Sequence, residues 1–184
     1  MLLEISGSHG IMRRYFVVNG FDGALTMLGI VMGFAVSAPT APAVVISACV
    51  GAAVALAVSG VSSAYVSEVA ERRKALLDLE RAMMTGLEQS AHGRAARWVP
   101  LLIGLVNGLA PLLISLLIIA PLWLAEAGVD LPLAPLHLAI VMALLVIFLL
   151  GVFLGRVSGV SWWRSGLQTV LIAAVTMGLV YWLG

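Results

Sequence analysis

The chain has 184 residues, of which 62% are hydrophobic and 10% are charged, and its mean hydropathy is +1.12. Soluble domains are typically about 45–50% apolar and about 25% charged. The composition therefore excludes an ordinary soluble protein and predicts an all-α integral membrane protein in contact with the lipid bilayer. The net charge of +1 gives no reason to expect a nucleic-acid partner. The single cysteine, Cys49, excludes an intrachain disulfide.

Five apolar runs are each near the length of about 20 residues that a helix needs to cross hydrocarbon. They cover residues 15–38, 43–66, 98–124, 133–154 and 162–183. We therefore expect a single five-helix membrane domain over residues 1–184. The first ten residues lack the pattern of a cleavable signal peptide, so the first run is expected to remain as a transmembrane helix.

The positive charges are distributed asymmetrically along the chain. They precede the first run, separate the second from the third, and separate the fourth from the fifth: Arg13, Arg14, Arg72, Arg73, Lys74, Arg81, Arg94, Arg97, Arg156 and Arg164. The loops after the first and third runs have none. The positive-inside rule then predicts a multi-pass protein of the cell membrane, with a cytoplasmic N-terminus and the C-terminus outside.

The second apolar run continues into a stretch of good helix formers that extends to about residue 84. We expect the second helix to continue into the cytoplasm for several turns and to end at Thr85-Gly86, with a short connector over residues 87–97. Residues 67–97 as a whole are therefore predicted to form a cytoplasmic helical extension and connector.

Carboxylates on this extension are candidates to collect a cation. Glu68 and Glu71 lie one helical turn apart near the membrane, where two carboxylates can share a cation. The alternative for Glu71, Asp78 and Glu80 is a solvated helix face on which Arg72 and Lys74 are their partners. Asp78, Glu88 and His92 are weaker cytoplasmic metal candidates.

Asp22 lies inside the first apolar run, eight residues past Arg14, which corresponds to roughly 12 Å along a helix. A charge at that depth costs a few kcal/mol or more unless it is paired, protonated or bound to a cation. The intervals of three and four residues predict one helix face made by Asn19, Asp22, Thr26, Gly29 and Gly33. The glycines alone fit a helix-packing seam. Because a seam has no use for a carboxylate, we interpret this face as part of a cation path with Asp22 as a ligand.

Other spans carry weaker signals. The second run has a stripe of small residues that includes Ser62, which fits either tight packing or a path lining. Asn107 lies in the third run, and together with Asn19, Thr26 and Ser62 it is a candidate auxiliary oxygen along the path. Close packing is predicted where the fourth run ends in glycines at intervals of four, at Gly151, Gly155 and Gly159.

The sequence argues against an enzyme. It contains no phosphate-binding glycine loop with its lysine, no His-Glu-x-x-His, no Gly-x-Ser-x-Gly and no paired histidines at metal-ligand spacing. Oxygen ligands of the kind present here suit divalent cations. One carboxylate is a poor cage for a cation, whereas a symmetric homodimer would bring two Asp22 side chains to one axis.

Residues 20–33, Gly-Phe-Asp-Gly-Ala-Leu-Thr-Met-Leu-Gly-Ile-Val-Met-Gly, resemble the first-helix signature of the vacuolar iron transporter family, in particular its shorter prokaryotic members. Residues 59–67 are similar to its second-helix signature. The resemblance implies a homodimer of five-helix protomers with an ion path at the dimer interface. It also implies export of Fe²⁺ or Mn²⁺ from the cytosol in exchange for protons, without a permanently bound cofactor. Asp22 matches the family's pathway aspartate.

Two positions depart from the family pattern. Where the second helix of the family typically has a methionine and a glutamate, this chain has Gly60 and Ala64. Glu68 lies one turn beyond Ala64 on the same face and is a candidate to replace the glutamate. The departures keep a second hypothesis open, namely a membrane binding or scaffold protein that does not transport. In that case Asp22 would pair with a buried donor and would be structural.

Overall fold

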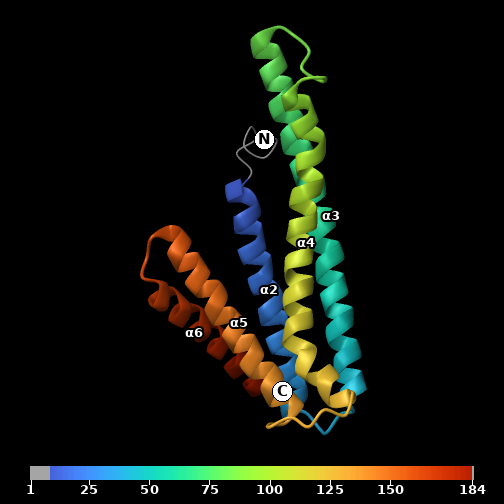
Figure 1. The fold of residues 1–184 in the computed structure, drawn as a ribbon, viewed down its shortest axis with the longest axis vertical. Helices are drawn as coiled ribbons and strands as arrows, with labels where there is room; N and C mark the ends of the chain where they lie inside the picture. The colour runs from blue at the N-terminus through green and yellow to red at the C-terminus, as the bar shows by residue number, and fades with distance from the viewer. Residues whose placement is uncertain (1–8, 184) are drawn as a thin grey trace. The chain divides into compact units, whose positions relative to one another are not determined.

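The structure is a computed structural model, and it describes residues 9–183, so residues 1–8, for which no cleavable signal was predicted, lie outside the described part. The described residues form five helices and no strand: α2 (His9–Val36), α3 (Pro42–Met83), α4 (Ala91–Glu126), α5 (Pro135–Ser158) and α6 (Trp162–Leu183) (Figure 1). All five are long and apolar enough to cross a membrane. The prediction of an all-α, multi-pass membrane protein with five spans is confirmed.

The helix α3 continues without a break through 42 residues, as the run of helix formers predicted. At a rise of 1.5 Å per residue it is roughly 63 Å long, about twice the thickness of the hydrocarbon layer. α3 is therefore longer than a helix needs to be to cross the bilayer. Its last helical residue, Met83, precedes Met84, which has a left-handed backbone with φ of 50°.

Residues 91–97 of the predicted connector are helical and form the start of α4. The reason is a helix cap that the apolar pattern did not reveal. The Ser90 hydroxyl accepts a hydrogen bond from the Gly93 amide at 3.2 Å and donates one to the Leu87 carbonyl at 2.6 Å. A serine at this position satisfies an amide that the first helical turn leaves without a partner.

The chain divides into two compact units. The first contains the described residues up to Asn19 together with Ala57–Ala110, and the second contains Gly20–Leu56 and Pro111–Gly184. Three helices, α2, α3 and α4, each contribute a segment to both units, and α5 and α6 belong to the second.

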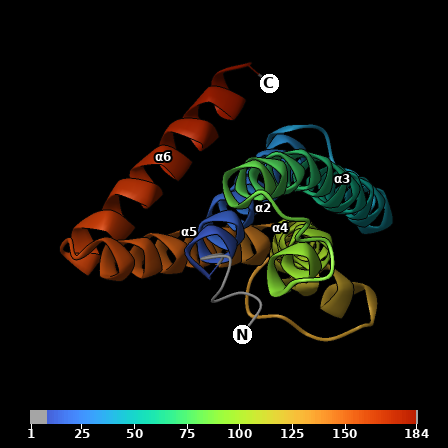
Figure 2. The ribbon, with the colours of Figure 1, turned by 90° about the horizontal axis from the view of Figure 1, so that it is seen from above.

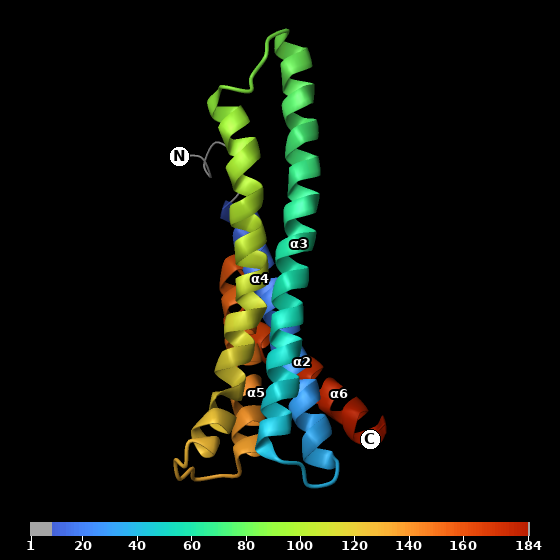
Figure 3. The ribbon, with the colours of Figure 1, turned by 90° about the vertical axis from the view of Figure 1, so that its right-hand side faces the viewer.

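In the first unit, α3 and α4 pack closely as antiparallel neighbours through glycines (Figure 3). A Cβ on Gly60 would lie 3.0 Å from the Asn107 carbonyl oxygen, and one on Gly104 would lie 3.1 Å from the Val61 carbonyl oxygen. Only residues without a side chain allow helix backbones to approach this closely. A small cluster of buried side chains extends this contact: Ala64, Ala95, Val99 and Ile103.

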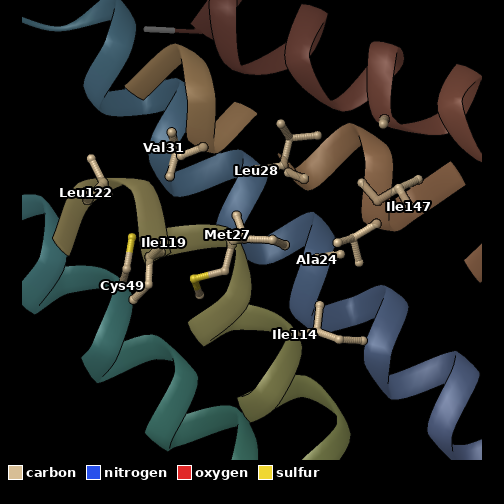
Figure 4. Packing of buried hydrophobic residues seen from close by; sticks show 14 of the residues in the cluster. Ala24, Met27, Leu28, Val31, Cys49, Ile114, Ile119, Leu122 and Ile147 are labelled. Atoms are coloured by element: carbon tan, nitrogen blue, oxygen red, sulfur yellow. The ribbon is translucent and has the colours of Figure 1, made fainter. Parts of the chain in front are cut away.

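The core of the second unit is apolar and comes from all five helices. α2 turns one face into it, with Ala24, Met27, Leu28 and Val31 fully buried. Figure 4 shows this face meeting side chains from α3, α4 and α5, among them Cys49, Ile114, Ile119, Leu122 and Ile147. These contacts determine how α2 is rotated about its axis, and so which of its residues are left outside.

Figure 2 shows α5 and α6 meeting near the turn that joins them and diverging from there. Two of the predicted glycines lie at this contact. A Cβ on Gly151 would lie 2.8 Å from the Ser165 carbonyl oxygen, and one on Gly155 would lie 2.9 Å from the Ser165 Cβ, which confirms close packing at both. The prediction for Gly159 is wrong, because nothing lies within 4 Å of its would-be Cβ. Gly159 instead ends α5 as a left-handed C-cap with φ of 71°, a conformation that favours glycine.

Candidate functional site

Asp22 lies on α2 among the residues of the second unit, on the outer surface of the single chain. The neighbouring Gly23 is buried against Pro111, which turns Asp22 outward. The structure records no hydrogen bond or ion pair to Asp22 from any described residue. An ionised carboxylate in hydrocarbon costs several kcal/mol when nothing compensates it. The surroundings must therefore supply a cation, a proton or a second protein surface.

The rest of the predicted α2 stripe in the second unit shares this open face. Thr26 is partly exposed, and none of residues 9–183 lies within 4 Å of a Cβ built on Gly29 or on Gly33. The glycines are thus available for close packing, but they are not used by the chain's own helices. This surface of α2, made by Asp22, Thr26, Gly29 and Gly33, is called the open α2 face below.

Asn19 and Asn107 are held in a hydrogen-bond network of the first unit. The Asn19 Nδ2 donates to the Tyr15 carbonyl at 3.0 Å and to Oδ1 of Asn107. The Asn107 Nδ2 in turn donates to the Gly60 carbonyl at 2.7 Å. Both polar atoms of the buried Asn107 side chain are therefore engaged, and the network joins α2, α3 and α4. An ion would have to displace one of these bonds in order to use Asn107 as a ligand.

Ser62 is exposed on α3, and its hydroxyl donates to the Val58 carbonyl one turn earlier at 2.7 Å. That bond stays within the helix and leaves the lone pairs of the hydroxyl oxygen available. The Ser62 oxygen therefore remains free to accept a bond or to contact an ion.

Glu68 is buried, with 9% of its surface exposed, and its Oε2 lies 3.4 Å from Nε of Arg72 one turn along α3. Gly60, Ala64 and Glu68 are all buried, so they share the face predicted from their spacing. This face points toward α4, where the Gly60 backbone nearly touches that of Asn107. A long side chain at either of the two departing positions would require α3 and α4 to move apart.

The remaining acidic and histidine candidates are scattered over the first unit. Glu71 is exposed, and Asp78 lies 3.6 Å from Arg81 in an exposed ion pair. Glu88 and His92 line two different hollows beside α3. Within residues 9–183 no three His, Cys, Asp or Glu side chains gather closely enough to hold a metal ion. A single described chain therefore brings none of the predicted ligands together into a complete cation cage.

One polar group was missed by the sequence analysis. The Ser115 hydroxyl is fully buried in α4 and has no hydrogen-bond partner among the described residues. Buried polar groups almost always have a partner, so this hydroxyl is an unsatisfied oxygen inside an apolar core. The sequence signal was present as a serine one turn after Pro111 in an otherwise apolar run.

Comparison with known proteins identifies the family. The family model described as "VIT family" matches residues 68–184. An uncharacterized protein of Methanocaldococcus jannaschii is 30% identical over 169 residues, which cover 90% of this chain and 84% of the relative. No solved structure matches the chain. The family match begins at Glu68 and so does not contain Asp22, whereas the alignment with the archaeal protein covers most of the chain. The chain belongs to the VIT family, the vacuolar iron transporters that its first-helix signature resembles.

Proposed function

We propose that the protein is a homodimeric carrier that moves Fe²⁺ or Mn²⁺ out of the cytosol in exchange for protons, through a path at the dimer interface. Membership of the VIT family indicates a transporter of metal ions across a membrane rather than an enzyme, and the five spans fit that role. The metal, the direction, the protons and the dimer are parts of the proposal.

The observation that carries the proposal is the position of Asp22 on the open α2 face. The carboxylate lies within a membrane span, has no partner among the described residues, and is followed on the same face by two glycines with open space beside them. A second copy packed on this face about a two-fold axis would place two Asp22 carboxylates near each other. The pair would then have twice the ligand atoms, and Thr26 would add a hydroxyl from each protomer.

The charges of such a pair explain why metal and protons would exchange. Two carboxylates with one divalent cation carry no net charge, and neither do the same two groups when each is protonated. Every other occupancy leaves net charge in the low-dielectric region, where it is costly. We therefore expect two protons to move against each metal ion. The cation and the protons compete for the same carboxylate oxygens, so metal release and protonation are coupled.

The remaining candidates are assigned along the route. Glu68 and Glu71 would collect the cation at the cytoplasmic mouth, since α3 projects beyond the hydrocarbon there. Asp78, Glu88 and His92 would attract it from farther out. The auxiliary oxygens differ in availability: Ser62 is exposed, whereas Asn19 and Asn107 are already hydrogen-bonded to each other.

The scaffold hypothesis requires Asp22 to pair with a buried donor. The structure records no such donor among residues 9–183, and the carboxylate is exposed rather than buried. This observation favours the carrier. The absence of the family's methionine and glutamate at Gly60 and Ala64 does not weaken the carrier proposal, because both residues are buried in the packing of the first unit, whereas the open α2 face belongs to the second.

Transport by purified protein in liposomes tests the proposal. Fe²⁺ and Mn²⁺ uptake is followed with a trapped metal indicator, and proton release is followed with a trapped pH indicator. We expect Asp22→Asn to lower the initial rate by at least about tenfold, since even outer-shell changes at metal sites cost about 10–100-fold. Glu126→Gln, which removes an exposed carboxylate at the end of α4, is the matched control and should keep the parent rate.

Two results would refute the mechanism. If Asp22→Asn carries metal at the parent rate, Asp22 is not the transit ligand. If the parent moves no metal while Asp22→Asn lowers its thermal stability, the scaffold hypothesis is correct.

A further inference from the structure

Two arginines of the first unit meet at the charged ends of α3 and α4. Arg73 of α3 and Arg97 of α4 line one hollow of about 180 Å³, together with Val69, Leu76 and Glu88. The two guanidinium groups and the one carboxylate leave an excess of one positive charge. Neither arginine forms an ion pair within the described residues, unlike Arg81, which lies beside Asp78.

The depth of this hollow follows from the packing of the two helices. Tyr65 of α3 lies beside Gly104 of α4, whose would-be Cβ is 3.3 Å from the Tyr65 Cβ. Arg73 is eight residues beyond Tyr65, and Arg97 is seven residues before Gly104. Because the helices are antiparallel, both arginines lie roughly 10–12 Å from the Tyr65 level, toward the charged ends.

A second hollow shares Arg97 with the first and is otherwise lined by aromatic and apolar side chains. It has a volume of about 310 Å³ and is lined by Tyr65, Arg97, Trp98 and Leu101, so that Arg97 belongs to both hollows. The Tyr65, Trp98 and Leu101 side chains are all exposed. Tyrosine and tryptophan are enriched at the level of lipid headgroups, where one end of the side chain is apolar and the other is polar. The two hollows on either side of Arg97, together called the groove below, therefore offer guanidinium groups, aromatic rings and a leucine.

The geometry points to a binding site for one anionic phospholipid in this groove. The phosphate lies between the Arg73 and Arg97 guanidinium groups, which are suited to hold phosphate oxygens through paired N–H donors. The glycerol region lies beside Trp98, and one acyl chain follows Tyr65 and Leu101. Basic hollows between transmembrane helices are known places for anionic headgroups. With Glu88 counted, the arginine hollow keeps a net charge of +1. A zwitterionic lipid is therefore expected to bind less well than an anionic one, because it carries no net negative charge.

This proposal is independent of the transport proposal, because it uses neither Asp22 nor a second copy of the chain. Binding of lipid is measured by native mass spectrometry of the full chain in detergent, with dioleoyl phosphatidylglycerol and dioleoyl phosphatidylcholine as probes. We expect phosphatidylglycerol to bind more tightly than phosphatidylcholine. We expect Arg73→Gln and Arg97→Gln each to weaken phosphatidylglycerol binding about tenfold, because each removes a charge-assisted hydrogen bond to the phosphate.

Arg94→Gln is the matched control, because it removes the same charge from the same helix. Arg94 is exposed, donates to the Gln89 carbonyl at 3.2 Å, and lines neither of the two hollows. We expect the Arg94→Gln protein to bind phosphatidylglycerol within twofold of the parent affinity. The substitution removes one exposed positive charge but no residue of the proposed binding site. Equal weakening by Arg94→Gln and Arg97→Gln would mean diffuse surface attraction and would overturn the proposal.

A second measurement locates the lipid without relying on affinity. Phosphatidylglycerol with brominated acyl chains quenches nearby tryptophan fluorescence, and we expect Trp98→Phe to remove most of the quenching that exceeds the level seen with brominated phosphatidylcholine. Excess quenching that survives Trp98→Phe would place the lipid elsewhere and would also overturn the site.

Discussion

At the scale of single residues, the polar groups inside the spans differ in how many bonds they already make. Asn107 is buried and uses both of its side-chain atoms in hydrogen bonds. Asp22 is exposed and uses none with the described residues. A satisfied amide stabilises a helix contact, whereas an unsatisfied carboxylate in hydrocarbon is destabilising until something binds it. Both were predicted as oxygen ligands from sequence, and their surroundings now rank Asp22 first.

Gly23 provides a stability test beside that carboxylate. A Cβ there would lie 2.8 Å from the Pro111 Cα and 2.9 Å from the Pro111 carbonyl oxygen. Backbone cannot move aside as a flexible side chain can, so we expect Gly23→Ala to lower the free energy of unfolding by about 1–3 kcal/mol. Reversible unfolding in mixed detergent micelles measures the change.

The control for Gly23→Ala is Gly51→Ala, a change within α3, outside the open α2 face, with no described residue within 4 Å of the new methyl group. We expect no loss of stability there, because alanine is the better helix former by about 0.5–1 kcal/mol. Equal destabilisation by the two substitutions would show that α2 is not rotated as described.

At the scale of the helices, α2 has one face buried in the core and one face left open. One face packs into the core of the second unit through Ala24, Met27, Leu28 and Val31. The other is the open α2 face, where small residues and a carboxylate lie outside the chain's own packing. Glycine exposed to lipid adds little to the stability of a membrane helix, whereas glycine in a helix–helix contact lets the two backbones approach closely.

The open α2 face predicts self-association that depends on its glycines. We expect the double substitution Gly29→Leu with Gly33→Leu to raise the dimer dissociation constant by about tenfold or more, because central contact residues dominate interface free energies. Single-molecule photobleaching in liposomes counts the protomers per complex.

Gly178→Leu is the comparison for this experiment, since Gly178 of α6 also has open space beside it but lies on another helix. It should leave the dimer fraction unchanged. A parent protein that remains monomeric at high protein-to-lipid ratio would contradict the dimer and, with it, the paired Asp22 site.

At the scale of the whole molecule, the charge pattern and the helix lengths support each other. All ten lysines and arginines lie in the first two turns of α2, on the later part of α3 and the start of α4, or near the turn between α5 and α6. An odd number of spans places the two termini on opposite sides of the membrane. The positive-inside rule then predicts which side is which.

Reporter fusions test this orientation. Alkaline phosphatase is active only outside the cytosol, and green fluorescent protein is fluorescent mainly inside it. We expect an active phosphatase after residue 184 and an inactive one at Gly86, in the connection between α3 and α4, with the fluorescent protein giving the reverse pattern. A bright fluorescent fusion at residue 184 would reverse the proposed topology and the direction of cation entry.

The sequence by itself determined the five helices long enough to cross a membrane, the continuation of α3 through a charged stretch to Met83, and the membership of Asp22, Thr26, Gly29 and Gly33 in one helix face. These properties depend on local hydropathy, helix propensity and a period of 3.6 residues, all of which can be read within one segment. The start of α4 was missed because a single serine cap, rather than apolar content, determines it.

Only the tertiary structure decided what each face meets. Contacts between segments far apart in the sequence turn Asp22 outward, satisfy Asn107, and make Gly159 a helix end while Gly151 and Gly155 are packing positions. The same contacts bring Arg73 and Arg97 into one hollow, although 24 positions separate them in the sequence. The rotation of a helix about its axis is set by the partners it packs against, and a periodic pattern alone cannot name those partners.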